Sequence, residues 1–303
     1  MLKIKIKDIE FNNPIIASSG TFGYGYEVAD FVDLSKLGCV ITKSITLEPR
    51  NGNSSPRIHE SESGMINSIG LANVGVDKFC NNEIQKLNNI NTKFIISIAG
   101  KKYQDYLDVI KKIEATKSNH VGYEVNVSCP NTSSGGMEFG VDAKMTHKLT
   151  SELRQETDKL LIVKLSPNVT SIGKIALAAE SAGADAISAV NTFVGLSLDY
   201  KTGKFVLSNK FGGVSGPAIK PMALAKVYQI FNEVKIPIIG MGGISSFKDV
   251  IEFIRAGATM VQVGTLNYRD PAILSTFNNQ IESFLKSINI DSISDLIGRH
   301  YEN

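Results

Sequence analysis

The chain has 303 residues, of which 43% are hydrophobic and 20% charged, and its 32 basic and 30 acidic side chains nearly balance. This composition suits one large hydrophobic core, and the even charge provides no field that would attract a nucleic acid. No apolar run reaches about 18 residues, so we expect no membrane span and a cytoplasmic protein. The three cysteines and four histidines show no metal-ligand spacing, so no metal site is predicted.

The first predicted element is a hairpin over residues 2–11, where apolar and polar side chains alternate around a turn near Lys7 and Asp8. We expect it to plug the bottom of a barrel. Eight short apolar runs then recur along the chain. Runs this apolar are buried on both faces, as parallel strands are. The runs cover residues 14–17, 39–42, 94–98, 123–127, 161–165, 186–190, 236–239 and 260–263.

Helical patterns lie between the apolar runs. Residues 103–113 and 172–179 keep an apolar face at helical spacing, and so do residues 250–254, with Ser246 as the expected N-cap and an end near Gly257. Strand and helix alternating eight times over predict a (β/α)8 TIM barrel. The chain shows no linker or repeat, so residues 1–303 are predicted to form a single domain. An open, doubly wound sheet is the structural alternative.

Two long insertions depart from a minimal barrel. The first covers residues 45–75, and the second covers residues 195–216 with a hairpin around residues 200–203. Long loops on the strand-end side usually build a site or a partner surface. Cys39 and Cys80 are expected in the core, and His59 on the surface.

Polar residues end the apolar runs, and in a barrel the strand ends converge on the face that carries active sites. Two lysines, Lys43 and Lys164, end apolar strands, where an unpaired charge is costly. Cys129 lies among amides and a hydroxyl, the surroundings that a thiol needs to exchange a proton near pH 7. The alternative is that strands simply stop in polar residues. The end residues include Ser18, Ser19, Ser44, Ser97, Asn126, Ser166, Asn191 and Thr192.

The last two runs end in glycine-rich segments, Gly242-Gly243 and Gly264-Thr265. Glycines let backbone N–H groups approach an anion, and the loops after the last two strands of a barrel commonly hold phosphate. Tight-turn chemistry is the alternative. No GxGxxG follows a strand, so we expect no dinucleotide site in this chain. One phosphate and a large polar cavity suggest flavin mononucleotide (FMN).

These motifs together resemble the class 1 dihydroorotate dehydrogenases. The resemblance implies a (β/α)8 barrel with FMN at its mouth that oxidises dihydroorotate to orotate in pyrimidine synthesis. It runs nearly end to end, through residues 13–14, 17–25, 41–44, 64–73, 126–131, 164–167, 190–192, 212–221, 240–244 and 264–265.

The resemblance also implies roles for individual residues. Cys129 would be the base that takes a proton from C5 of the substrate, while a hydride passes from C6 to the flavin. Lys164 would lie near the N1–O2 edge of the flavin. The other cofactor-binding residues would be Ser19, Lys43, Ser44, Ser97, Asn126, Val190, Gly216, Gly242, Gly243, Gly264 and Thr265. The substrate would be held by Lys43, Asn67, Ser68, Ile69, Gly70, Leu71, Asn126, Asn131, Asn191 and Thr192.

Residues 17–25, 191–192 and 213–218 are most similar to the NAD-linked branch, class 1B. There the homodimer core associates with an iron–sulfur flavoprotein that carries FAD, in a heterotetramer. Ser97 departs from that branch, where asparagine is expected, and is similar to the fumarate-reducing homodimers. This chain has neither a dinucleotide motif nor cysteines for a cluster, so a partner must carry both.

Three other readings stay open. The first is a fumarate-reducing homodimer, and the second is another flavin barrel of the dihydropyrimidine dehydrogenase or dihydrouridine synthase type. A uracil-type substrate lacks a carboxylate, so Lys43 with residues 67–71 favours orotate, and a tRNA substrate would call for a basic patch. The third is a barrel that binds a phosphate ligand without turnover.

Overall fold

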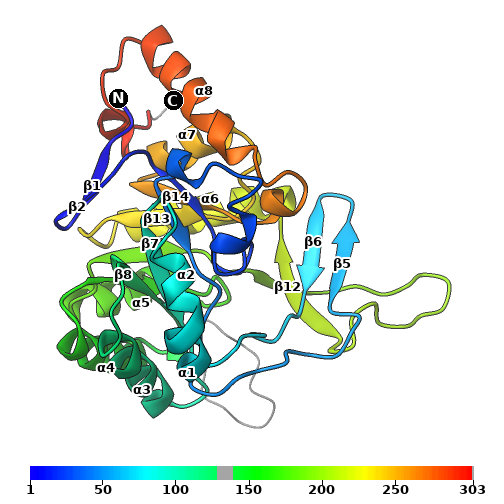
Figure 1. Ribbon diagram of the computed structural model, residues 1–303. Coiled ribbons are helices and arrows are strands. Elements are labelled where there is room, and N and C mark those ends of the chain that lie inside the picture. Colours follow the sequence, from blue (N-terminus) through cyan, green and yellow to red (C-terminus); the bar gives the residue numbers. More distant parts are fainter. Residues whose placement is uncertain (128–138, 302–303) are drawn as a thin grey trace.

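The computed structural model describes residues 1–127 and 139–301, and eight parallel strands close into a barrel at its centre (Figure 1). The predicted barrel is confirmed, and each of the eight apolar runs supplies one strand. Neighbours along the chain pair in parallel, and the last strand pairs with the first. The barrel strands are β3 (Ile15–Ala17), β4 (Cys39–Ile41), β7 (Phe94–Ile98), β8 (Gly122–Asn126), β9 (Leu160–Lys164), β10 (Ala186–Ala189), β13 (Ile238–Met241) and β14 (Met260–Val263).

Helices surround the barrel and bury their apolar faces against it. In α7, the Ser246 side chain accepts the N–H of Asp249, as predicted for an N-cap, and Val250, Phe253 and Ile254 are buried. The α-helices are α1 (Val76–Lys78), α2 (Ile84–Leu87), α3 (Tyr103–Glu114), α4 (Ala143–Glu156), α5 (Ile172–Ser181), α6 (Lys220–Phe231), α7 (Phe247–Arg255) and α8 (Leu274–Ser287), with a π-helix at Phe79–Glu83. Single 3-10 turns cover Tyr26–Val28, Leu34–Lys36, Phe139–Val141, Pro217–Ile219, Thr265–Tyr268 and Ile293–Leu296.

The N-terminal hairpin, β1 (Ile4–Ile6) and β2 (Ile9–Phe11), lies at the amino end of the barrel. Lys7, in its turn, donates to the Asp158 carbonyl at 2.7 Å and to the Asp185 carboxylate at 3.3 Å. Asp158 lies two residues before β9 and Asp185 lies directly before β10, so the turn is fixed at the amino ends of these strands. The buried Ile6 and Phe11 extend the core there, and the expected hairpin is confirmed.

The two long insertions pair with each other. Each supplies two strands to a second, antiparallel sheet of order β11-β12-β6-β5, which stands beside the barrel in Figure 1. The loop between β11 and β12 projects from the molecule there. The sheet strands are β5 (Ile58–Ser61), β6 (Gly64–Asn67), β11 (Phe193–Leu196) and β12 (Phe211–Ser215).

Three expectations for residues outside the predicted site are met. Cys39 and Cys80 are buried free thiols, and His59 is exposed on β5. Among the residues that the structure describes, no helix is both long and apolar enough to cross a membrane.

Below the barrel, His120 is enclosed between Phe94 and Tyr123. Its Nδ1 lies 3.0 Å from the Ser118 hydroxyl, and its Nε2 has no hydrogen-bond partner among the described residues. Burial lowers the pKa of His120 to about 4, with Lys159 acting in the same direction and Glu114 against it. The folded chain therefore holds a neutral imidazole.

We predict that the free energy of unfolding falls between pH 7 and about pH 5. The unfolded chain takes up a proton at His120 near its ordinary pKa of about 6.5, whereas the folded chain does not until near 4. The loss should be about 1–2 kcal/mol at pH 5.2 in urea titrations. In His120→Gln this decrease in the free energy of unfolding with falling pH should disappear. An equal decrease in the variant would show that His120 is not its source.

Candidate active site

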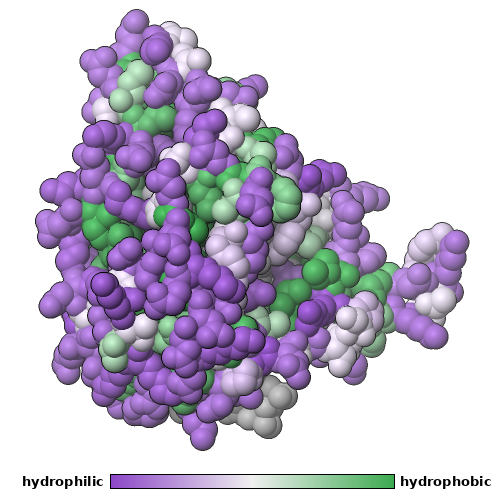
Figure 2. All heavy atoms as spheres, in the orientation of Figure 1, coloured by the Kyte–Doolittle hydropathy of each residue, from purple (hydrophilic) through white to green (hydrophobic). Residues whose placement is uncertain are grey.

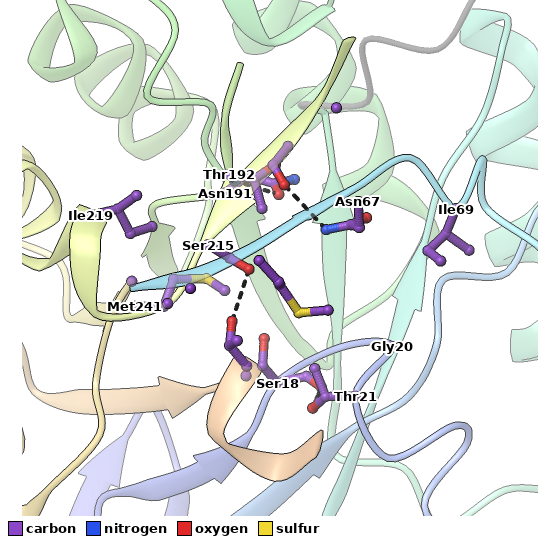
Figure 3. A pocket seen from close by; sticks show the side chains of 18 of the residues that line it. Ser18, Gly20, Thr21, Asn67, Ile69, Asn191, Thr192, Ser215, Ile219 and Met241 are labelled. Carbon is purple, nitrogen blue, oxygen red and sulfur yellow. Dashed lines mark hydrogen bonds between the residues drawn. The ribbon is translucent and has the colours of Figure 1, made fainter. Parts of the chain in front are cut away.

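A cavity of about 1260 Å³ opens at the carboxyl ends of the barrel strands, between them and the small sheet. Cavities for one small molecule usually measure roughly 300–1,000 Å³, so this space can hold a cofactor and a substrate together. Side chains from both sheets face into it (Figure 3).

The sequence-predicted residues come together around this cavity. Cys129 and Asn131 lie outside the described residues. Ser97 is fully buried and does not line the cavity, and its hydroxyl lies 2.8 Å from that of Ser44, through which it reaches the site. The predicted residues on the lining are Ser19, Lys43, Ser44, Asn67, Ser68, Ile69, Gly70, Leu71, Asn126, Lys164, Val190, Asn191, Thr192, Gly216, Gly242, Gly243, Gly264 and Thr265.

The floor of the cavity carries a buried cation. Lys164, at the end of β9, is 5% exposed, and its Nζ lies 3.4 Å from Oε1 of Glu124. The sequence analysis missed Glu124, although a carboxylate inside the apolar run 123–127 was a visible signal. Gln262, on β14, also lines the floor and was missed. An ammonium held here can stabilise negative charge that develops on a bound ligand.

One side of the cavity is lined by carboxamides. The side chain of Asn126, at the end of β8, donates to the Ser44 hydroxyl at 3.4 Å, and the Asn191 side chain donates to Oδ1 of Asn126 at 3.5 Å. The Asn67 side chain, on β6, points toward Asn191 and Thr192 in Figure 3. Because a carboxamide both donates and accepts, such a set can bind the edges of a planar ring that carries N–H and C=O groups.

Ser68, next to Asn67, carries a buried hydroxyl that finds no partner within the described part of the chain. The residue lines the same cavity as the carboxamides. A buried hydroxyl without a hydrogen bond is unfavourable, so this atom fits a role toward a bound ligand.

Backbone donors gather after β13 and β14. In residues 1–127 and 139–301, the N–H groups of Gly243, Gly264 and Thr265 donate to no protein acceptor, and all three residues line the cavity. Unpaired N–H groups that converge in this way fit a phosphate group.

The first turn of α7 contributes less to this anion site than its position suggests. Ser245 and Ser246 both donate their N–H groups to Asp249 at 2.8 Å. Burial would raise the pKa of Asp249, but hydrogen bonds from Lys220, Ser245 and Ser246 outweigh it and hold the pKa below its usual range. The ionised carboxylate thus occupies the donors of this helix end, and the loop amides remain for the ligand.

Hydroxyl groups connect the barrel to the small sheet at the rim. The Thr265 and Ser215 hydroxyls lie 2.8 Å apart, the contact drawn from Ser215 in Figure 3. The Tyr268 hydroxyl donates to the Gly20 carbonyl at 3.1 Å. The first contact connects β12 to the segment after β14, and the second connects the segments that follow β14 and β3.

We predict that Gly243→Ala lowers cofactor affinity. Gly243 has φ +77°, and a Cβ there would lie 2.8 Å from the backbone nitrogen of Lys220 and 2.9 Å from the backbone oxygen of Gly216. The left-handed backbone alone costs an alanine about 1–2 kcal/mol, and the loop must also move away from its anion-binding position. The dissociation constant of the flavin measures the effect.

Gly203→Ala is the matched control for this substitution. Gly203 has a similar φ of +67° but open space around its Cβ position, in the projecting loop away from the cavity. Its alanine variant should be slightly less stable and should bind the flavin normally. Equal flavin binding by both variants would contradict the phosphate site.

The fold and site define a class of protein, a (β/α)8 barrel with unpaired backbone N–H groups after its last two strands and a buried lysine on the cavity floor. The model of the family described as dihydroorotate dehydrogenase matches residues 1–285. The chain therefore belongs to the dihydroorotate dehydrogenase family, whose members are flavin-dependent oxidoreductases.

Similar proteins named dihydroorotate dehydrogenase B (NAD(+)), catalytic subunit, match nearly end to end. The protein from Malacoplasma penetrans is 46% identical over 99% of this chain and 98% of its own length. That from Carboxydothermus hydrogenoformans is 46% identical over 98% of this chain and 96% of its own length. That from Geotalea uraniireducens is 44% identical over 98% of this chain and 97% of its own length.

Proposed function

We propose that this chain is the catalytic subunit of an NAD-linked dihydroorotate dehydrogenase, which oxidises (S)-dihydroorotate to orotate in pyrimidine biosynthesis. The observation that carries the proposal is the cavity itself. It combines a buried lysine, facing carboxamides and unpaired backbone donors in a chain that aligns throughout with enzymes of that name.

We assign FMN, a flavin with a single phosphate, to this cavity. The N–H groups of Gly243, Gly264 and Thr265 would bind its single phosphate, and Lys164 would lie near the N1–O2 edge of the isoalloxazine ring. The bound flavin would supply the hydride acceptor for C6 of the substrate. Ser44, backed by Ser97, would hold the ring from the side of β4.

Substrate recognition follows from the remaining lining residues. Lys43 would pair with the substrate carboxylate, and Asn67, Asn126 and Asn191 would bind the ring carbonyl and N–H groups. Cys129, predicted from the sequence as the base, follows Asn126 by three residues and would take the C5 proton. The pKa of a free cysteine thiol is about 8.5, so a modest effect of the surroundings is enough for a thiol to act as a base near pH 7.

Electron transfer to NAD+ calls for a partner. This chain has no dinucleotide motif and only three cysteines, so we assign the FAD and iron–sulfur cluster to a second subunit in a heterotetramer. An exposed apolar surface on the small sheet and its loop supports subunit contacts (Figure 2). It contains Ile58, Val194, Leu196, Leu198, Phe205 and Phe211, each 43–59% exposed. Free Cys39 and Cys80 support a reducing compartment, the cytoplasm.

The first experiment is to purify this chain alone and follow dihydroorotate oxidation with three acceptors, namely an artificial dye, NAD+ and fumarate. We expect dye reduction without efficient use of NAD+ or fumarate, and bleaching of the bound flavin by dihydroorotate. Efficient fumarate reduction would contradict the NAD-linked assignment. A bound flavin that dihydroorotate does not bleach would contradict dihydroorotate oxidation itself.

A further inference from the structure

Glu124 carries a carboxylate in the middle of barrel strand β8, with no exposed surface. Removing a carboxylate from water is strongly unfavourable unless charges and hydrogen bonds compensate for it. The reaction proposed above gives this side chain no task. Its contacts therefore indicate why the barrel contains it.

Three donors surround the carboxylate. Lys164 Nζ lies 3.4 Å from Oε1, while the Ser188 hydroxyl and Gln262 Nε2 donate to Oε2 at 3.0 and 2.5 Å. The amide oxygen of Gln262 in turn accepts the Ser18 hydroxyl at 3.2 Å. The network thus connects β8, β9, β10 and β14 across the barrel interior.

The members of this network differ in their access to the cavity. Lys164, Gln262 and Ser18 line it, whereas Glu124 and Ser188 are not among its lining residues. Glu124 is therefore beneath the floor and holds two floor side chains, one of them the buried cation. A group in this place cannot contact a ligand on the other side of that floor, but its charge acts on the ligand through Lys164.

We infer that Glu124 is a positioning residue, which fixes the Lys164 ammonium on the cavity floor and offsets part of its charge toward the flavin. The inference rests on the proposed flavin function. The lysine charge favours the more negative, reduced cofactor, and a carboxylate 3.4 Å behind that charge opposes it. In a buried site the opposition is strong because little water screens it. Glu124 thereby sets how strongly the site prefers the reduced flavin.

Glu124→Gln tests this inference because it removes the charge and keeps the shape. Ser188 and Ser18 can reverse their hydroxyls and Gln262 can turn its amide, so the network can accommodate the new NH2 group. The measurement is the midpoint potential of the bound flavin, by reductive titration against a reference dye. We expect the preference for the reduced flavin to rise at least tenfold. For a two-electron couple this raises the midpoint potential by about 30 mV.

Ser188→Ala is the matched control, because it removes one hydrogen bond to the same carboxylate and leaves the charge pair intact. In this variant the midpoint potential of the bound flavin should change little, by an amount that corresponds to less than a threefold change in the preference for reduced flavin. An unchanged potential in Glu124→Gln with full flavin occupancy would overturn the inference. So would an equal shift in Ser188→Ala.

A double-mutant cycle on the apoprotein covers the case in which Glu124→Gln does not retain flavin. Urea unfolding is compared for Glu124→Gln, Lys164→Met and the double variant. If the two charges compensate each other, the double variant is more stable than the sum of the two single losses predicts. Additive losses would show that Glu124 acts on the fold independently of Lys164 and would overturn the inference.

Neither measurement uses dihydroorotate. A wild-type flavin that dihydroorotate fails to bleach would therefore refute the proposed function while the midpoint comparison still stands. Conversely, normal dihydroorotate oxidation by the wild type with no shift in Glu124→Gln would refute only the role of Glu124.

Discussion

Replacing Cys129 with alanine is expected to abolish most dihydroorotate oxidation while flavin and orotate still bind. A positioned base accelerates proton transfer by about 10²–10⁴-fold, so kcat should fall by a factor in that range. The carboxamides and lysines on the described cavity lining are unchanged in this variant, so ligand affinity should persist. Steady-state kinetics with a dye acceptor and orotate titration of the flavin spectrum measure the two effects separately.

Two further variants test this result: Cys129→Ser replaces the thiol with a hydroxyl, and Cys80→Ala is the control. The serine variant should retain weak activity that increases with pH, because a hydroxyl needs more help to lose its proton. Cys80 is buried against the backbone of α3 and does not line the cavity, so its alanine variant should oxidise dihydroorotate at the normal rate. A near-normal kcat in Cys129→Ala would refute the assignment of the base, and a pH-independent rate in Cys129→Ser would indicate another proton acceptor.

Lys164→Ala should combine loss of flavin with loss of stability. The substitution removes the positive charge from the cavity floor and leaves the Glu124 carboxylate buried without its counter-charge. Removing one partner of a buried pair typically lowers the free energy of unfolding by about 3–5 kcal/mol. Flavin occupancy after purification and urea unfolding of the apoprotein measure the two losses.

Lys159→Ala is the control for charge removal. Lys159 pairs with Glu114 at 2.9 Å, a shorter distance than in the Lys164 pair, but its side chain is 34% exposed at the amino end of β9. Because this pair is partly exposed to solvent, the variant should lose less stability than Lys164→Ala and should bind flavin fully. Unchanged flavin occupancy and reduction kinetics in Lys164→Ala would remove its proposed role.

The barrel could be predicted because each of its strands is a short, mostly apolar run that can be recognised from local sequence. The seventh strand begins two residues later than predicted, at Ile238, because Pro237 has no N–H to donate to the sheet. The residues around the cavity could be predicted for a related reason. Once the strands are parallel, their carboxyl ends must share one face, and Lys43, Asn126, Lys164 and Asn191 follow those ends.

Two features could not be predicted in this way. The small sheet depends on pairing between β6 and β12, which no local pattern specifies, and each insertion alone looks like a separate loop. The burial of Glu124 depends on Lys164, Ser188 and Gln262, which come from three other strands. A single acidic residue in an apolar run indicates that something must compensate for it, but not which side chains do so.

The small sheet also determines when the cavity can exist during synthesis. Asn67 of β6 hydrogen-bonds Gly213 of β12, which is 146 residues further along the chain. A nascent chain emerges from its amino end, so the β5–β6 hairpin lacks its β12 neighbour until more than two-thirds of the protein has been made. Gly264 and Thr265, which we propose bind the phosphate, follow later still. The flavin must accordingly be captured by a nearly finished polypeptide and cannot act as an early template for its folding.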